Sequence, residues 1–153
     1  MKQNIIFKTL CIIILLIFSY ACAVKKSLPV CHKDDVKYCT KKGAFRGKWY
    51  DYYLIGLSCM KGECYEAAIN SFYQAMDKKN RDQDQRMVRT YGMHVIDYFP
   101  HRELGIIHYY MGNFELSESE LNLSISQEPS EKAKFYLDKV RTSIRVQIFL
   151  DDI

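Results

Sequence analysis

Three histidines, His94, His101 and His108, follow one another at intervals of seven residues. On a single helix, residues seven apart lie within about 20° of one another around the axis, so three imidazoles on one face could bind Zn²⁺. Pro100 lacks an amide hydrogen and suits the first turn of a helix, so we expect the helix to begin there. His94 then lies in the preceding loop, and the sequence does not favour a metal site.

Arg102 and Glu103 lie beside His101 and would complete the composition of a small active site. Neighbouring helix positions point in different directions, however, so we do not expect these two charged side chains to pair. Glu103 instead suits the positive first turn of a helix. The H-E-x-x-H, G-x-S-x-G and phosphate-loop motifs do not occur. We therefore predict that the protein is not an enzyme and needs no cofactor, with catalysis as a third alternative.

Residues 1–22 have the layout of an export signal, because Lys2 and Lys8 precede an apolar stretch that runs from Leu10 to Phe18. The segment "FSYAC" resembles a bacterial lipidation signal and predicts a lipid on Cys22. Simple cleavage after Ala23 and an uncleaved anchor are alternatives. All three routes predict an exported protein of the cell envelope, in the periplasm or at an outer membrane face, held at the membrane by a lipid or by its signal.

Four cysteines follow the signal, namely Cys31, Cys39, Cys59 and Cys64. Four thiols in an oxidising compartment favour two disulfides, and three pairings are possible. We predict the two pairings that close short local loops, Cys31 with Cys39 and Cys59 with Cys64. A four-cysteine zinc site is the alternative, but spacings of seven and four residues are unlike the tight C-x-x-C knuckles of such sites.

Residues 23–47 form a basic, cysteine-containing tether with Pro29, Gly43 and Gly47. We predict a solvated spacer, and the alternative is a segment that lies on anionic lipid headgroups. The formal net charge of the whole chain is only +4, which indicates no nucleic-acid partner.

From Trp49 onward the apolar spacing is helical, and it repeats between residues 50–76 and residues 100–129. In both stretches a glycine lies midway along a helical run, a second glycine marks a turn, and an amphipathic helix follows. Each unit is therefore predicted to be a helical hairpin. Residues 83–97 are inserted between the units as an ordered loop, and Ser130 can cap a long helix that ends at about Leu150.

These units resemble the tetratricopeptide repeat, a helical hairpin of about 34 residues. The positions that match in the second unit are Leu104, Gly105, Gly112, Asn113, Phe114, Ser117, Leu121, Ser124 and Pro129. Those that match in the first unit are Ile55, Gly56, Tyr65, Ala68, Phe72 and Ala75. The resemblance implies an all-α domain over residues 48–153, a short α-solenoid of two repeats and a C-terminal capping helix. It also implies that His101 and His108 pack in the seam of a hairpin.

A narrower resemblance covers the stretches "CTKKGAFRGKWYDYYLIGLS", "RTYGMHVIDYFPHRELGI" and "SEKAKFYLDKVR". They are similar to the N-terminal tetratricopeptide module of longer exported bacterial proteins and lipoproteins. This resemblance implies an exported scaffold or sensor module, and it implies no catalytic residue.

In this family the first helix of each hairpin lines a concave groove, which implies a surface that binds a protein or peptide partner. The groove residues carried over are Tyr50, Tyr53, Leu57, Met60, Arg102, Ile106, Tyr109, Tyr110 and Tyr136. Rigid tyrosine rings with polar tips are typical of binding hot spots. The alternative is that several of them belong to the core. We therefore expect a non-catalytic scaffold of the bacterial cell envelope. The second hypothesis is an accessory lipoprotein of a pilus or outer-membrane assembly that acts by oligomerisation, for example as a homodimer.

Overall fold

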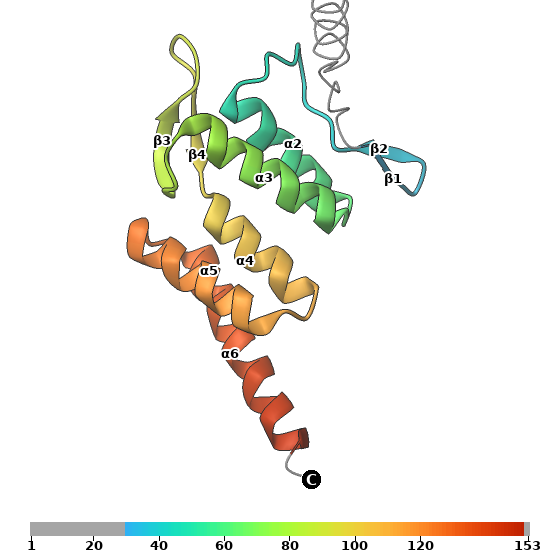
Figure 1. The fold of residues 1–153 in the computed structure, drawn as a ribbon, viewed down its shortest axis with the longest axis vertical. Coiled ribbons are helices and arrows are strands. Elements are labelled where there is room, and N and C mark those ends of the chain that lie inside the picture. The colour runs from blue at the N-terminus through green and yellow to red at the C-terminus, as the bar shows by residue number, and fades with distance from the viewer. Residues whose placement is uncertain (1–29, 152–153) are drawn as a thin grey trace, which may run out of the picture.

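The computed structural model describes residues 30–151 (Figure 1). The predicted signal 1–22, its lipidation site Cys22 and the first part of the tether lie outside the described residues. Within the described range the chain forms five helices and two small antiparallel sheets. In chain order these elements are β1 (Cys31–Lys33), β2 (Val36–Tyr38), α2 (Trp49–Lys61), α3 (Tyr65–Lys79), β3 (Gln85–Arg89), β4 (Val95–Tyr98), α4 (Pro100–Tyr110), α5 (Phe114–Gln127) and α6 (Glu131–Asp151).

The prediction of an all-α fold is wrong, because the chain is mostly helical but also contains two β-hairpins. The β1–β2 hairpin turns at Asp34 and Asp35, which both have positive φ as a tight two-residue hairpin turn requires. The β3–β4 hairpin occupies segment 83–97, which we expected to be a loop. These strands are only three to five residues long, so the alternation of their side chains is too short to give a clear periodic signal in the sequence.

Two helical hairpins, α2 with α3 and α4 with α5, form the body of the molecule. In each hairpin a glycine of the first helix faces a large side chain of the second. A Cβ atom at Gly56 would lie 2.7 Å from the Phe72 ring, and one at Gly105 would lie 2.6 Å from Leu121 Cγ. These glycines therefore allow an approach that any side chain would prevent, as the sequence predicted.

The N-terminus of α4 is held by loop 81–84. The Asp84 carboxylate accepts hydrogen bonds from the backbone amides of His101 and Arg102, at 3.0 and 3.2 Å. Asp84 is buried, and burial raises the pKa of its carboxyl although these amides oppose the shift. The helix begins at Pro100, as expected. Asp84 of the loop thus caps α4, whose own N-cap residue, Phe99, makes no side-chain cap hydrogen bond.

The three histidines do not lie on one helix. His94 lies in the turn of the β3–β4 hairpin, whereas His101 and His108 are both buried in α4. The His101 ring lies between two carboxylates. Its Nδ1 is 2.6 Å from Glu120 of α5, and its Nε2 is 2.5 Å from Asp82. Across residues 30–151 no group of three or more His, Cys, Asp or Glu side chains could hold a metal ion.

Helix α6 covers the open side of the α4–α5 hairpin with its first half. Ser130 Oγ accepts a hydrogen bond from the Ala133 amide at 3.2 Å, so the predicted cap is confirmed. Ala133, Leu137 and Val140 bury their side chains against Ile106 and Leu121. Among the helices that the structure describes, none combines the length and the apolar character that crossing a bilayer demands.

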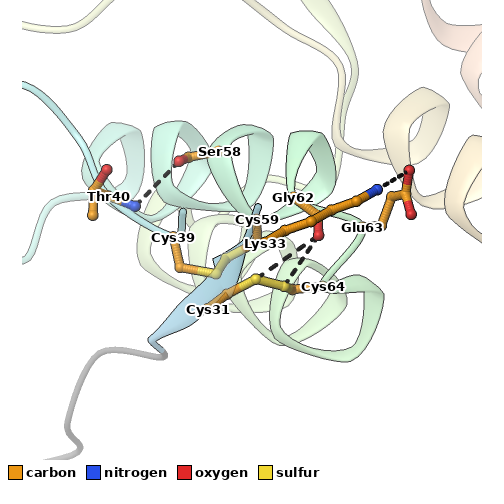
Figure 2. Close-up of a disulfide and its surroundings, with 9 residues drawn as sticks. All are labelled: Cys31, Lys33, Cys39, Thr40, Ser58, Cys59, Gly62, Glu63 and Cys64. Atoms are coloured by element: carbon orange, nitrogen blue, oxygen red, sulfur yellow. Dashed lines mark hydrogen bonds and ion pairs between the residues drawn. A yellow bond between two sulfur atoms is a disulfide. The ribbon is translucent and has the colours of Figure 1, made fainter. Parts of the chain in front are cut away.

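The four cysteines form two disulfides, but the predicted local pairing is wrong (Figure 2). Cys31 pairs with Cys64 at the start of α3, and Cys39 pairs with Cys59 in α2. The reason is that the β1–β2 hairpin lies against the end of α2, so its cysteines face the helices rather than each other. Both disulfides are compatible with an oxidising, exported compartment.

Candidate functional site

A pocket of about 410 Å³ opens where the C-terminal end of α2 approaches α4, α6 and the start of α3. Its walls combine apolar side chains, tyrosine rings and four charged groups. The lining residues are Leu57, Met60, Lys61, Glu63, Tyr65, Glu103, Tyr110, Lys132 and Tyr136. A concave site of this size with a few convergent polar groups is typical of a binding site.

Three tyrosines from three helices form one wall of this pocket. The rings of Tyr65 and Tyr110 are parallel, with centroids 6.0 Å apart, and the hydroxyls of Tyr110 and Tyr136 are hydrogen bonded at 2.8 Å. Burial, followed by the hydrogen bond with Tyr110, raises the pKa of Tyr136 to about 12. The Tyr136 hydroxyl therefore stays protonated at neutral pH, and the wall offers flat apolar faces with hydroxyl tips.

The floor of the pocket contains the carboxylate of Glu103, whose negative charge is balanced by two nearby cations. Glu103 is buried, and it accepts hydrogen bonds from Arg102 Nε at 2.8 Å and from Lys132 Nζ at 2.8 and 3.0 Å. The expectation that Arg102 and Glu103 would not pair is wrong, because the long arginine side chain folds back around the start of α4. With both oxygens engaged by cations, Glu103 has the role of a structural ion pair rather than of a free general base.

Four of the nine predicted groove residues line this pocket, namely Leu57, Met60, Tyr110 and Tyr136. A fifth, Tyr109, is half-buried beside them, with its ring 5.8 Å from that of Tyr136. These five residues are brought together from α2, α4 and α6.

The other four predicted residues do not face the pocket. Tyr50, Tyr53 and Ile106 are buried in the core, and the Arg102 guanidinium lies 4.0 Å from the centre of the Phe99 ring. The Tyr53 hydroxyl accepts a hydrogen bond from the Phe99 amide at 3.0 Å, and burial raises its pKa. These side chains connect the two hairpins, so the alternative of core residues describes them better.

Sequence reasoning missed five lining residues. Glu63 precedes α3, Tyr65 begins it, and Lys132 lies in the first turn of α6. Lys61 and Glu103 lie on the first helices, but at positions that the tetratricopeptide resemblance does not assign to the groove. Apart from Tyr136, the groove was expected from such positions of the first helices alone. One signal in the sequence could have indicated Tyr65. It directly follows Cys64, and a disulfide at Cys64 fixes the position of the residue beside it.

Within residues 30–151 no cluster of three or more metal-ligating side chains occurs, in the pocket or elsewhere. What the pocket offers is tyrosine faces, two apolar side chains and a mixture of charges, and these groups can hold a ligand. No model of a known protein family matches the chain, and no curated protein matches it either.

Proposed function

We propose that the protein is an exported, non-catalytic interaction module, related to tetratricopeptide repeat proteins, that binds a segment of a protein partner in the pocket between α2, α4 and α6. The observation that carries this proposal is the convergence of Leu57, Met60, Tyr110 and Tyr136, together with Tyr65, on one concave site. A lipid on Cys22 would hold the module at the cell envelope.

The chemistry of the pocket favours an extended peptide segment with one large apolar or aromatic side chain. Tyr65 and Tyr110 present stacked rings that such a side chain can cover, and hydroxyls at the rim can bond to its backbone. Lys132 is already paired with Glu103, so Lys61 is the lining cation that an acidic residue of the partner would meet.

A photo-crosslinking amino acid at position 110 tests this proposal in the native cell. Tyr73 on α3 is the matched control, because its exposed fraction is 50% against 52% for Tyr110 and it lies outside the pocket. We expect position 110 to capture one dominant envelope protein that position 73 does not. The purified partner should then lose at least tenfold in affinity for the Tyr110→Ala, Tyr136→Ala variant, with an unchanged helical signal. Equal capture at both positions, or unchanged affinity, would contradict the proposal.

A second candidate function, assembly through self-association, is favoured by the outer face of α6. Phe135, Val146 and Phe149 are all more than half exposed on this helix. Their spacing of eleven and three residues fits the seam of two paired helices. In this case sedimentation of the full chain in detergent should show a dimer, and Val146→Lys should convert it to a monomer. A monomer at high concentration would eliminate this candidate.

A further inference from the structure

A second surface lies at the end of the molecule opposite the C-terminal end of α6 (Figure 1). It is formed by the chain that leads into α2, residues 40–49, and by the tip of the β3–β4 hairpin, residues 87–95. The two segments contact each other at Tyr91, whose ring lies 6.0 Å from that of Tyr50 and 5.5 Å from the Arg46 guanidinium. They therefore form one continuous surface.

Large apolar side chains protrude from this surface. Met93 lies at the apex of the hairpin turn and is 89% exposed, and Phe45 and Tyr91 are 40% and 52% exposed. The turn is closed by the hydrogen bond from the His94 amide to the Tyr91 carbonyl at 3.0 Å. Tyr91 lies between the two segments and lines a small cavity with Arg46 and Tyr50, whereas Met93 and Phe45 line none of the cavities found in the described residues. Met93 and Phe45 are therefore the side chains suited to entering a soft medium.

The charge of the same surface is of one sign. Residues 40–49 and 87–95 contain five lysines and arginines, and no aspartate or glutamate. Lys41 is paired with Asp51 of α2 at 2.6 Å. Among the described residues Lys42, Arg46 and Arg89 have no carboxylate within ion-pair distance. These basic side chains belong to the same two segments as the exposed apolar side chains, and no ion pair within the described residues occupies them.

We propose that this surface docks on an anionic lipid bilayer, with Met93 and Phe45 entering the boundary between headgroups and acyl chains and the basic side chains contacting lipid phosphates. Apolar side chains ringed by lysine and arginine are the combination that interfacial binding uses. The unpaired cations complement a negatively charged membrane surface, and no acidic residue of either segment opposes them.

This orientation leaves the pocket accessible. The membrane-facing surface adjoins the N-terminal end of α2, whereas the pocket lies at its C-terminal end. Thirteen helical residues span about 20 Å, so a partner could bind in the pocket while the opposite end contacts lipid. The docking surface does not depend on the proposed function, because it shares no residue with the pocket.

Tryptophan fluorescence of the full chain tests the docking. Trp49 is the only tryptophan, so Trp49→Phe provides a silent background into which Met93→Trp or, as a control, Tyr73→Trp is introduced. The probe is a vesicle of phosphatidylcholine with or without about 30% phosphatidylglycerol, carrying brominated acyl chains that quench a buried indole. An unchanged circular dichroism spectrum is required of each variant. If Trp49→Phe impairs folding, Met93→Trp is measured as a difference spectrum in the presence of Trp49.

We expect a blue shift and quenching at position 93 with the anionic vesicles, and neither at position 73. Each basic residue near an anionic surface contributes about fivefold to binding, so Lys42→Gln with Arg46→Gln should lower the tip-insertion constant about 25-fold. Quenching at position 93 that equals that at 73, or that is the same in neutral vesicles, would overturn the proposal. All variants carry the same predicted N-terminal anchor, so the anchor cannot produce a difference in quenching between positions 93 and 73.

Discussion

Replacing Gly105 by alanine tests whether close contact between α4 and α5 supports the fold. The new Cβ would lie 2.6 Å from Leu121 Cγ, 3.0 Å from its Cδ2 and 3.2 Å from its backbone nitrogen. Distances under 3.0 Å require movement, and a branch carbon next to the backbone cannot swing aside as the end of a flexible side chain can. The two helices would therefore have to separate.

The magnitude follows from two opposing effects. Overpacking a well-filled core costs about 1–3 kcal/mol, and the contact with backbone puts this site at the upper end of that range. Alanine is about 1 kcal/mol better than glycine in a helix, which offsets part of the loss. We expect Gly105→Ala to lower the free energy of unfolding by about 2 kcal/mol, measured by urea denaturation of the oxidised protein.

A double-mutant cycle with Leu121→Ala isolates the contact. Leu121→Ala alone should cost about 2–5 kcal/mol, because it leaves a cavity in the core. In that background the branch carbons are absent and only the contact with the backbone nitrogen at 3.2 Å remains. The cost of that contact roughly offsets the helix preference of alanine, so Gly105→Ala should have almost no further effect. The coupling energy is then about 2 kcal/mol. If Gly105→Ala costs the same in both backgrounds, the steric reasoning is incorrect.

Three further predictions concern stability. Tyr53→Phe should lower the free energy of unfolding by about 1–3 kcal/mol, because the buried Phe99 amide loses its acceptor, and an unchanged urea midpoint would contradict this. Burial lowers the pKa of His101, but the carboxylates of Glu120, Asp82 and Asp84 together raise it by more, so the net shift is upward. The stability from this charged histidine should be complete below about pH 6.5 and lost as pH rises through the raised pKa, whereas His101→Gln should show no such decline in a series of thermal melts. Reduction of the disulfides, which close loops of 20 and 33 residues, should cost on the order of 3–4 kcal/mol for each, visible as a fall in Tm with added reductant.

Helix positions could be predicted from the sequence because their signals are local. Pro100 begins α4 and Ser130 caps α6. Gly56 and Gly105 mark the point where the first helix of each hairpin approaches the second. Each of these residues acts on its own backbone or on a partner at a fixed repeat distance. The disulfide pairing and the two β-hairpins depend instead on how a segment lies against distant helices, and spacing along the chain carries no information about that.

The candidate site could be predicted in part for a related reason. Groove positions at the C-terminal ends of α2 and α4, such as Met60 and Tyr110, do line the pocket. Positions nearer the N-terminal end of α2 are covered by the β3–β4 hairpin, because the Tyr53 ring lies 4.9 Å from that of Tyr98 and Tyr50 is covered by Tyr91. The unrecognised hairpin therefore covers two of the nine expected groove residues, Tyr50 and Tyr53.

The disulfides connect the unexpected β1–β2 hairpin to the pocket. Cys64 directly precedes Tyr65, and Cys59 directly precedes Met60, so each crosslink holds a residue next to one that lines the site. Tyr65 is the first residue of α3, and a helix end held only by hydrogen bonds frays, so its ring would sample several positions. Ordering such side chains on binding costs about 0.5–1.5 kcal/mol each. If the pocket binds a partner as proposed, crosslinks made during folding bear that cost in advance, because Cys31–Cys64 holds the start of α3 and Cys39–Cys59 holds the end of α2.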